Sequence, residues 1–388
     1  MVDFGIDVLM GGKAPWQKGQ RIGLLCNHAS VNQQLVHSRI VLQQRFGSDL
    51  TCIFSPQHGF NAEKQDNMIE SDHAIDALTG LQLFSLYGES RKPTREMFDY
   101  IDVLVIDIQD VGTRVYTFLY TMAYCLEAAR TFGKKVVVLD RPNPIGGLRV
   151  EGNLLTSDNL SFVGLYPLPM RHGLTFAELG RFINREFAIG AELEVVPMAG
   201  WQRSMYYRDT GLPWVFPSPN MPTPETAIVY PGQVIWEGTT VSEGRGTCLP
   251  FELCGAPYWQ HDRILSQLDE LELPGCTFRP VIFEPTSGKW AAEACTGFHL
   301  HVTDQDNFRP YRTSLALLQI VMTTYPDEFS YKDPPYEYNF EQLPMDLILG
   351  DKTVREKLED GVPVTELEKE WQDPLNEFNQ GRQNYLLY

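Results

Sequence analysis

The sequence has little basic charge and no long apolar run. Its 388 residues include 32 Lys and Arg against 50 Asp and Glu, a formal net charge of −18 at pH 7. A nucleic-acid interface normally requires a basic surface, so this balance argues against nucleic-acid binding. No stretch reaches the roughly 18 apolar residues that span a bilayer, and residues 1–10 lack the basic and apolar regions of a secretion signal. We therefore expect a cytoplasmic protein without membrane contact.

Common cofactor and metal motifs are also missing. The seven cysteines form no Cys-x-x-Cys pair with zinc spacing, which favours reduced, mostly buried thiols. The sequence has no Gly-x-Gly-x-x-Gly after its first apolar run, no Gly-x-x-x-x-Gly-Lys-Ser/Thr and no Gly-x-Ser-x-Gly. His299 and His301 would share a strand face and could bind a metal, but no third ligand is recognisable, and two solvent-facing histidines are the alternative. We expect neither a cofactor nor a metal.

The first half alternates short apolar runs with segments of helical period. Each run ends in a polar cluster, as is typical of buried parallel strands; the runs are 21–26, 51–54, 103–108 and 135–139. Between the last two, apolar residues from Val115 to Ala129 recur at helical spacing, and Gly133 is placed to end the helix. The pattern predicts an α/β domain, a parallel sheet with helices on both faces, whose ligand sits beyond the carboxyl ends of the strands.

The composition changes after residue 210. Residues 211–250 are rich in Pro, Gly, Ser and Thr and too long for an ordinary linker, so we expect site-forming loops between two domains. Before them we expect a helix over 175–187, opened by a Thr175–Glu178 capping box, and a strand over 193–197. After them we expect strands over 276–283 and 297–303, a helix over 314–325, and a last helix that opens at Thr365 and that Pro374 stops or kinks. The predicted domains are residues 1–228 and a smaller α+β domain, residues 229–388, with the site between them.

Polar residues gather in the loops that follow the predicted strands and in residues 211–250. They are Gln57, His58, Glu70, Gln109, Asp110, Arg114, Asn220, Glu237, Glu243 and Arg245. Carboxylates, amides and guanidinium groups beside Trp201, Trp214 and Trp236 suit a polyhydroxylated, acidic ligand, because indoles cover the apolar face of a sugar. Two carboxyl groups in such a cleft could cleave a glycosidic bond. The structural alternative for one loop is that Asp110 caps the following helix and pairs with Arg114.

These loops also carry a series of ordered motifs. They are Ser55-Pro56-Gln57-His58-Gly59-Phe60, Leu86-Tyr87-Gly88, Gln109-Asp110-Val111-Gly112-Thr113-Arg114, Leu139-Asp140-Arg141-Pro142-Asn143-Pro144, Arg171-His172-Gly173, Pro217-Ser218-Pro219-Asn220-Met221-Pro222, Glu237-Gly238-Thr239 and Ser242-Glu243-Gly244-Arg245-Gly246-Thr247. With them, essentially the whole chain resembles the DUF1343 family, which includes exo-β-N-acetylmuramidases of the NamZ type.

The resemblance carries expectations about fold and function. It implies a Rossmann-like domain with a smaller C-terminal domain and a site in the cleft between them. It implies release of N-acetylmuramic acid from the non-reducing ends of peptidoglycan fragments, in cell-wall recycling. It also implies that the substrate is bound by Gln57, His58, Asn67, Gln109, Arg114, Arg141, Asn143, Arg171, His172, Asn220 and Arg245.

The sequence departs from the muramidase pattern at two positions. Where muramidase members have a Glu before the His-Gly pair and another three residues before Glu70, this chain has Gln57 and Asn67. An amide cannot act as a general acid. Catalysis then rests on other carboxylates (Glu70, Asp110, Glu237 and Glu243 are the candidates), or the protein acts on another sugar, or it binds amino sugars or muropeptides without cleaving them. An α/β oxidoreductase is suggested only by fold analogy.

Two further predictions concern individual residues. Glu70 is the remaining glutamate of its motif, and burial beside Tyr87 or the charge of Asp110 could raise its pKa; its alternative role is to accept backbone hydrogen bonds within its loop. Arg114 and Arg245 are expected to face the cleft and bind an acidic substituent, such as the lactyl carboxylate of muramic acid, with bidentate geometry.

Overall fold

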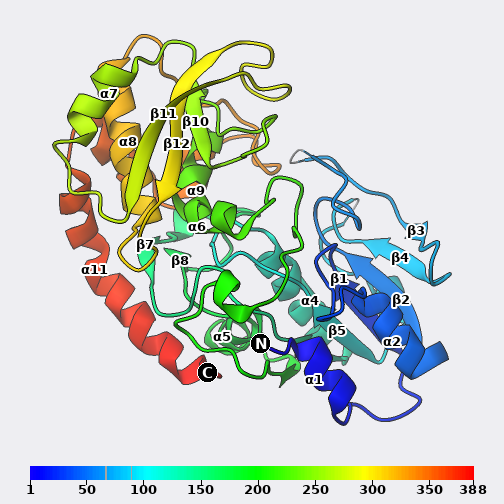
Figure 1. Ribbon diagram of the computed structural model, residues 1–388. Helices are drawn as coiled ribbons and strands as arrows, with labels where there is room; N and C mark the ends of the chain where they lie inside the picture. The colour runs from blue at the N-terminus through cyan, green and yellow to red at the C-terminus, as the bar shows by residue number, and fades with distance from the viewer. Residues whose placement is uncertain (66–67, 89) are drawn as a thin grey trace.

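The computed structural model describes residues 1–65, 68–88 and 90–388, and its largest element is a seven-stranded sheet (Figure 1). The strand order is β3-β4-β2-β1-β5-β6-β9, and neighbours are parallel except for the edge pair β3 and β4. The strands are β1 (Ile22–Cys26), β2 (Leu50–Ser55), β3 (Ala74–Ile75), β4 (Gln82–Ser85), β5 (Val103–Asp107), β6 (Lys135–Leu139) and β9 (Glu192–Val196). The expected parallel sheet is confirmed, and the four predicted apolar runs form β1, β2, β5 and β6.

Helices cover both faces of this sheet, which explains why its central strands are apolar throughout. Every residue of β1 and β5 is buried. Leu24 packs into the core on one face and Leu25 into the core on the other. One core takes side chains from α1 and α2, and the other takes them from α4 and α5. These helices are α1 (Gly5–Gly11), α2 (Ser38–Phe46), α4 (Phe118–Phe132) and α5 (Phe176–Glu186).

Local signals set the ends of two of these helices as predicted. Gly133 follows α4 in the left-handed conformation, with φ of 65°. Thr175 caps α5, and Thr175 and Glu178 form the reciprocal hydrogen bonds of a capping box.

The C-terminal part contains a second, antiparallel sheet with its own helices (Figure 1). Its strand order is β10-β12-β11, and β11 has the bounds that the sequence predicts. The remaining elements are α3 (Arg95–Phe98), β7 (Glu151–Leu154), β8 (Pro169–Arg171), α6 (Pro224–Gln233), the 3-10 turn η4 (Val234–Gly238), β10 (Leu253–Ala256), α7 (His261–Leu268), β11 (Cys276–Phe283), β12 (Cys295–Val302), α8 (Pro310–Thr324), α9 (Pro344–Leu349) and α10 (Lys352–Glu359), with short 3-10 turns elsewhere. Across the described ranges, none of the helices combines the length and apolar character that crossing a bilayer requires.

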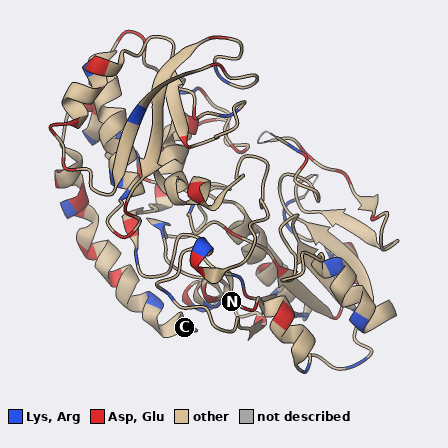
Figure 2. Cartoon of the chain, viewed as in Figure 1, with Lys and Arg blue, Asp and Glu red and all other residues tan. Residues whose placement is uncertain are grey.

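The last helix, α11 (Val364–Gly381), runs along the edge of the molecule toward the N-terminal sheet, and charged residues recur along its length (Figures 1 and 2). Two details correct the sequence prediction. The helix begins at Val364 without a side-chain cap, and it continues past Pro374, which therefore does not stop it. Burial of Trp371 and Leu375 on either side of this proline holds the helix together across the missing backbone donor.

Candidate active site

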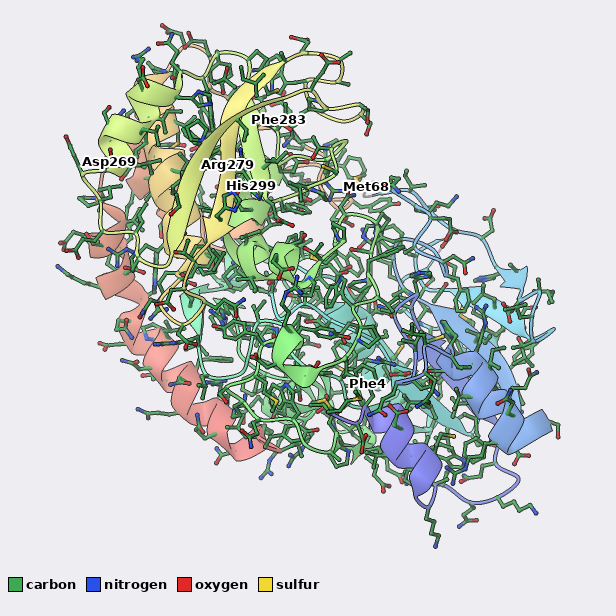
Figure 3. The ribbon with its side chains drawn as sticks, viewed as in Figure 1. Phe4, Met68, Asp269, Arg279, Phe283 and His299 are labelled. Atoms are coloured by element: carbon green, nitrogen blue, oxygen red, sulfur yellow. The ribbon has the colours of Figure 1, made fainter. Side chains whose placement is uncertain are left out.

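A pocket lies where the strand-end loops of the large sheet meet the C-terminal part of the chain. Its polar lining comes from Gln57, His58, Tyr116, Thr117, Ser218, Asn220, Tyr230, Glu237, Arg245, Tyr336 and Glu337. A second pocket shares Glu237, Arg245 and Tyr336 with it, so the two form one cleft. Met68, labelled in Figure 3, lines the second pocket from the loop after β2, where that loop approaches the C-terminal part.

Gln57 follows the carboxyl end of β2, and its amide organises one wall of the first pocket. Its Nε2 donates to Glu337 Oε1 at 2.9 Å and to the Tyr87 hydroxyl at 3.1 Å. Its Oε1 accepts from Thr117 Oγ1 at 2.5 Å. The Tyr87 hydroxyl donates in turn to Glu337 Oε2 at 2.7 Å. Gln57 therefore fixes a carboxyl group that the chain supplies from 280 residues further on.

Glu337 lies at the tip of a tight turn formed by residues 336–339, called here the acid turn. Tyr336 and Asn339 exchange backbone hydrogen bonds of 3.0 and 2.9 Å across it. The two central residues, Glu337 and Tyr338, have φ of 45° and 64°. Two positive φ values are the mark of a type I′ turn, which normally takes Asn, Asp or Gly at these positions. A left-handed backbone costs about 1–2 kcal/mol for each residue that has a Cβ, so surrounding contacts must hold the acid turn in place.

Glu237 lies in η4, the 3-10 turn that continues α6, and enters the same pocket from the C-terminal part. The Tyr336 hydroxyl donates to its Oε2 at 2.6 Å, and Arg245 Nη2 donates to its Oε1 at 2.5 Å. Burial alone would raise the pKa of Glu237, but Arg245 and the Tyr336 hydroxyl outweigh burial and hold the pKa below its usual value. Glu237 is therefore ionised at neutral pH.

The pKa of Glu337 is shifted in the opposite direction. Burial raises it, against the hydrogen bonds from Tyr87 and Gln57, which lower it, and the charge of Glu237 raises it further. One pocket thus holds two carboxyl groups whose surroundings push their pKa values apart. Such a pair is suited to divide the roles of acid and anionic partner in one reaction.

Glu243 pairs with two cations of the second pocket. Lys289 Nζ lies 2.7 Å from its Oε2, and Arg245 Nε lies 3.3 Å from its Oε1. Lys289 also donates to the Trp236 carbonyl at 2.6 Å. Arg245 therefore bridges Glu237 and Glu243, and its guanidinium lines both pockets.

Asp110 is not among the lining residues of either pocket. Its Oδ2 accepts from Gly112 N at 2.7 Å, and burial raises the pKa of Asp110 to about 7. The following helix begins at Phe118 with Thr117 at its cap position. The alternative in which Asp110 caps this helix and pairs with Arg114 is therefore wrong.

Arg114 does not face the cleft, which corrects the expectation that it binds an acidic substituent there. Its side chain has no exposed surface. Its two terminal nitrogens donate at 2.6–3.0 Å to the backbone carbonyls of Asn153, Leu168, Ile348 and Leu349. Arg114 thus ties the loop after β5 to α9 and to the β7–β8 region.

Gln109, Arg141 and Asn143 are also buried and make internal contacts. Gln109 Nε2 donates to the carbonyls of the backbone at residues 110 and 142, at 2.7 and 3.0 Å. Arg141 Nε lies 2.5 Å from Asp107 Oδ1 in a fully buried ion pair. Asn143 Nδ2 donates to the carbonyl of residue 174 at 2.9 Å. These side chains hold the strand-end loops in position behind the pocket wall.

Arg171 and His172 lie in β8 and directly after it, and both are buried. Arg171 donates to the Ile145 carbonyl. Burial lowers the pKa of His172 to about 3, with Arg382 and Arg171 adding to the effect, so its imidazole is neutral at pH 7. Neither residue is among those that line the two pockets.

The predicted site residues in the loop after β2 do not all reach the pocket. His58 lines the first pocket, and its Nδ1 lies 3.0 Å from the Lys64 carbonyl. Glu70 is exposed, which removes burial beside Tyr87, one of the two alternatives considered for it, and its Oε1 accepts from the Tyr338 hydroxyl at 3.1 Å. Asn67 lies outside the described residues. Asn220, from the loop before α6, also lines the first pocket.

Two of the tryptophans expected beside a sugar belong to the core instead. Trp236 has no exposed surface, and Trp201 is buried. A different tryptophan, Trp290, lines the second pocket together with Tyr336, and its indole nitrogen donates to the Thr240 carbonyl at 2.8 Å.

Sequence reasoning missed Glu337 and Tyr336. The only local signal is that both follow two consecutive prolines in an aromatic-rich stretch, Pro334-Pro335-Tyr336-Glu337-Tyr338. The Glu-Tyr pair does not resemble a type I′ turn, so neither the turn nor its approach to Gln57 could be recognised.

The histidine pair that could have held a metal lies on β12. His299 and Arg279 of the neighbouring strand β11 are labelled in Figure 3, and Arg279 Nη2 lies 3.3 Å from His299 Nδ1. Arg279 Nε donates to His301 Nε2 at 3.1 Å, so a cation already occupies the face between the two rings. Within residues 1–65, 68–88 and 90–388, no cluster of three His, Cys, Asp or Glu side chains is arranged to hold a metal ion.

Comparison with known proteins covers the whole chain. The N-terminal model of the exo-β-N-acetylmuramidase NamZ matches residues 22–225, and the C-terminal model matches residues 228–388. The peptidoglycan β-N-acetylmuramidase NamZ of Bacillus subtilis is 43% identical over 387 residues, which are 100% of this chain and 91% of that protein.

Two solved structures of DUF1343 family proteins from Bacteroides fragilis also align with 100% of this chain and 99% of theirs. One has a TM-score of 0.88 with 33% identity, and the other a TM-score of 0.77 with 28% identity. The fold, the two-part architecture and the full-length sequence similarity agree, and the chain belongs to the exo-β-N-acetylmuramidase NamZ family.

Proposed function

We propose that this protein is a glycoside hydrolase that releases N-acetylmuramic acid from the non-reducing ends of peptidoglycan fragments. The observation that carries the proposal is an ionised carboxylate, Glu237, in a pocket between the two regions that match the NamZ models. A fixed negative charge beside the sugar ring stabilises the oxocarbenium-like transition state of glycoside hydrolysis. The muramidase named among the relatives supports the choice of sugar.

The four carboxylates proposed from the sequence have unequal support. Glu237 lines the first pocket together with His58 and Asn220. Glu243 lines the adjoining pocket, where it is paired with Lys289 and Arg245. Glu70 and Asp110 line neither. We therefore assign the main catalytic role among these four to Glu237 and a supporting electrostatic role to Glu243.

The second pocket suits the acidic part of muramic acid. Its cations are Arg245, Lys289 and Lys332, and Trp290 offers an apolar ring face. We assign Arg245 to the lactyl carboxylate or to the ring that carries it, because its guanidinium lines both pockets and has N–H donors beyond those that Glu237 and Glu243 accept. His58 and Asn220 supply polar groups for the sugar hydroxyls and the acetamido group.

We also propose a role in cell-wall recycling within the cytoplasm. Released N-acetylmuramic acid is a sugar that a cell can reuse. The described cysteines, seven in number, are all free thiols, which suits a reducing compartment.

The experiment is a turnover assay with a disaccharide that carries N-acetylmuramic acid at its non-reducing end and N-acetylglucosamine at its reducing end. We expect stoichiometric release of both sugars, measured by mass spectrometry. The matched control is the same disaccharide with N-acetylglucosamine at the non-reducing end, which should stay intact. Binding of the first disaccharide in calorimetry without release would replace the hydrolase with a muropeptide-binding protein.

A further inference from the structure

We infer that Glu337 is the catalytic proton donor of this site and that Gln57 and Tyr87 are the residues that position it. The inference rests on the proposed glycosidase function and names a residue for a step that the sequence left unassigned. An amide at position 57 cannot donate a proton, but the carboxyl group that this amide holds can.

The position of Glu337 supports this role. Its side chain lines the first pocket together with Glu237, and only 4% of its surface is exposed. Gln57 and Tyr87 each donate one hydrogen bond to a different carboxyl oxygen. A carboxylate has about four lone-pair sites, so these two bonds orient the group and leave sites for a proton directed at the substrate.

The backbone at Glu337 is a second, independent observation. Glu337 and Tyr338 occupy the central positions of the acid turn with positive φ, where Asn or Gly would be unstrained. Strain of this kind persists only where the surroundings over-determine it, and it concentrates at active sites. The surroundings here are the Gln57 and Tyr87 bonds to Glu337 and the Arg91 guanidinium, 4.0 Å from the centre of the Tyr338 ring.

The charges around Glu337 suit a proton donor. The titratable and charged groups that face it are Tyr87 and Arg91 from the N-terminal part, Tyr230 from α6, Glu237 from η4, and Tyr336 and Tyr338 of the acid turn itself. Burial raises the pKa of Glu337, and the negative charge of Glu237 adds to that effect, so the protonated form persists to higher pH than in an exposed glutamate. Glu237 keeps its own charge because Arg245 and Tyr336 stabilise it.

The proposed step balances with water as the second reactant. The bond between the anomeric carbon and the bridging oxygen breaks, and its electron pair goes to that oxygen, which takes the proton of Glu337. Glu237 stabilises the positive charge that develops on the sugar ring. Water adds its oxygen to the anomeric carbon and loses one proton, which restores the protonated carboxyl group.

The test is Glu337→Gln assayed on two substrates that differ only in their leaving group. In the natural disaccharide the leaving group is a sugar alkoxide, which needs a proton to depart. In 2,4-dinitrophenyl N-acetylmuramide the leaving group is a stabilised phenolate, which departs without one. We expect the variant to lose about a hundredfold or more on the disaccharide and less than about tenfold on the dinitrophenyl glycoside. Equal losses on both substrates, or no loss on the disaccharide, would overturn the assignment.

Glu341→Gln is the matched control, because Glu341 lies close by in the chain but is exposed. It should behave as the wild type on both substrates. If the wild-type protein itself fails to cleave either muramide, the proposed function fails, and this outcome is distinct from a failure of Glu337. Thermal melting of both variants separates a loss of the acid from a loss of folding.

Gln57→Ala tests the positioning role and is a second variant should Glu337→Gln fold poorly. Removing the amide deletes one hydrogen bond to the ionised form of Glu337, so the basic limb of the pH profile of kcat/KM should move to higher pH while turnover falls by about tenfold. A purely structural role would lower the melting temperature and leave the pH profile in place.

Discussion

The two sides of the pocket are built from chain segments with opposite character. On one side, behind the pocket wall, lie the frame loops, residues 107–114 and 140–145, at the carboxyl ends of β5 and β6. Their side chains are buried, and those of Gln109, Arg114, Arg141 and Asn143 are bonded to backbone groups or to a buried carboxylate. On the other side lie η4 and the acid turn, whose carboxyl groups Glu237 and Glu337 enter the pocket itself. Both sides are rich in buried polar groups, but only the second presents them to a ligand.

The difference shows that a polar strand end is not by itself a binding residue. Arg114 and Arg141 lie where a ligand contact is expected in an open α/β sheet. Arg114 donates to backbone carbonyls instead, and Arg141 forms an ion pair with Asp107. The frame loops support the pocket wall from behind. The carboxyl groups that we propose to react with the substrate come from the C-terminal part. Substitutions in the frame loops should therefore change stability, whereas substitutions in η4 and the acid turn should change turnover.

The largest expected effect is that of Glu237→Gln. Loss of the charge that Tyr336 and Arg245 both stabilise should lower kcat by about a thousandfold, because the transition state loses its anionic partner. The measurement is steady-state hydrolysis of the muramic-acid disaccharide, with thermal melting beside it.

Glu252→Gln is the control for this variant. Glu252 is a buried carboxyl group that accepts from Thr226 Oγ1 at 2.6 Å and is not among the pocket-lining residues. It should lose stability rather than kcat. Turnover of Glu237→Gln within tenfold of the wild type would show that the chemistry lies elsewhere, and the comparison between the two sides of the pocket would break.

The frame side of the molecule was predictable from the sequence for a simple physical reason. A parallel strand buried on both faces requires a continuous apolar run, and 103–108 and 135–139 are such runs. The capping box at Thr175 and the left-handed Gly133 are equally local signals. Strands β3 and β4 were not predicted, because β3 is a pair of exposed residues and β4, although mostly buried, has only four residues, too few for a recognisable apolar run.

The site was predictable only in part. Gln57, His58, Glu237 and Arg245 could be named because they follow strands or lie in the Pro- and Gly-rich segment. Glu337 could not, because its place beside Gln57 depends on contacts 280 residues apart and on a turn that its own residue types disfavour. The burial of Arg114 likewise depends on α9 carbonyls that no local pattern reveals.

Arg114→Lys is the second prediction and tests whether a residue of the frame loops affects stability rather than sugar preference. An ammonium group cannot reach the four carbonyls that the guanidinium joins, so some buried acceptors lose their donor. We expect the free energy of unfolding to fall by about 3 kcal/mol, measured by urea denaturation, with the preference for muramic acid over N-acetylglucosamine unchanged.

Arg245→Lys is the matched variant on the other side of the pocket. Arg245 holds the pKa of Glu237 down, and a lysine offers a weaker pair, so the acidic limb of kcat/KM should move to higher pH. The sugar preference should also weaken. An Arg114→Lys protein of normal stability with altered sugar preference would reverse the roles that we give to the two arginines.

The smallest expected effect is that of Asp110→Asn. The direction in which its effect on melting temperature changes with pH distinguishes a residue of the frame loops from a catalytic one. The pKa of an aspartate in an unfolded chain is about 3.9, whereas burial raises the pKa of Asp110 to about 7 in the folded protein. Between these values the folded state binds the extra proton, so the contribution of Asp110 to stability is complete below about pH 4 and is lost as the pH rises through about 7.

Asparagine removes this titration while its side-chain oxygen can still accept from Gly112 N. The melting temperature of the variant minus that of the wild type should therefore be about 2 °C larger at pH 8 than at pH 5. Turnover of the variant at pH 7 should stay within about threefold of the wild-type value. Asp158→Asn, at an exposed position, is the control for the substitution itself. A hundredfold loss of turnover in Asp110→Asn would instead place the chemistry at the end of β5, because a group that only supports the frame loop does not have to exchange a proton with the substrate.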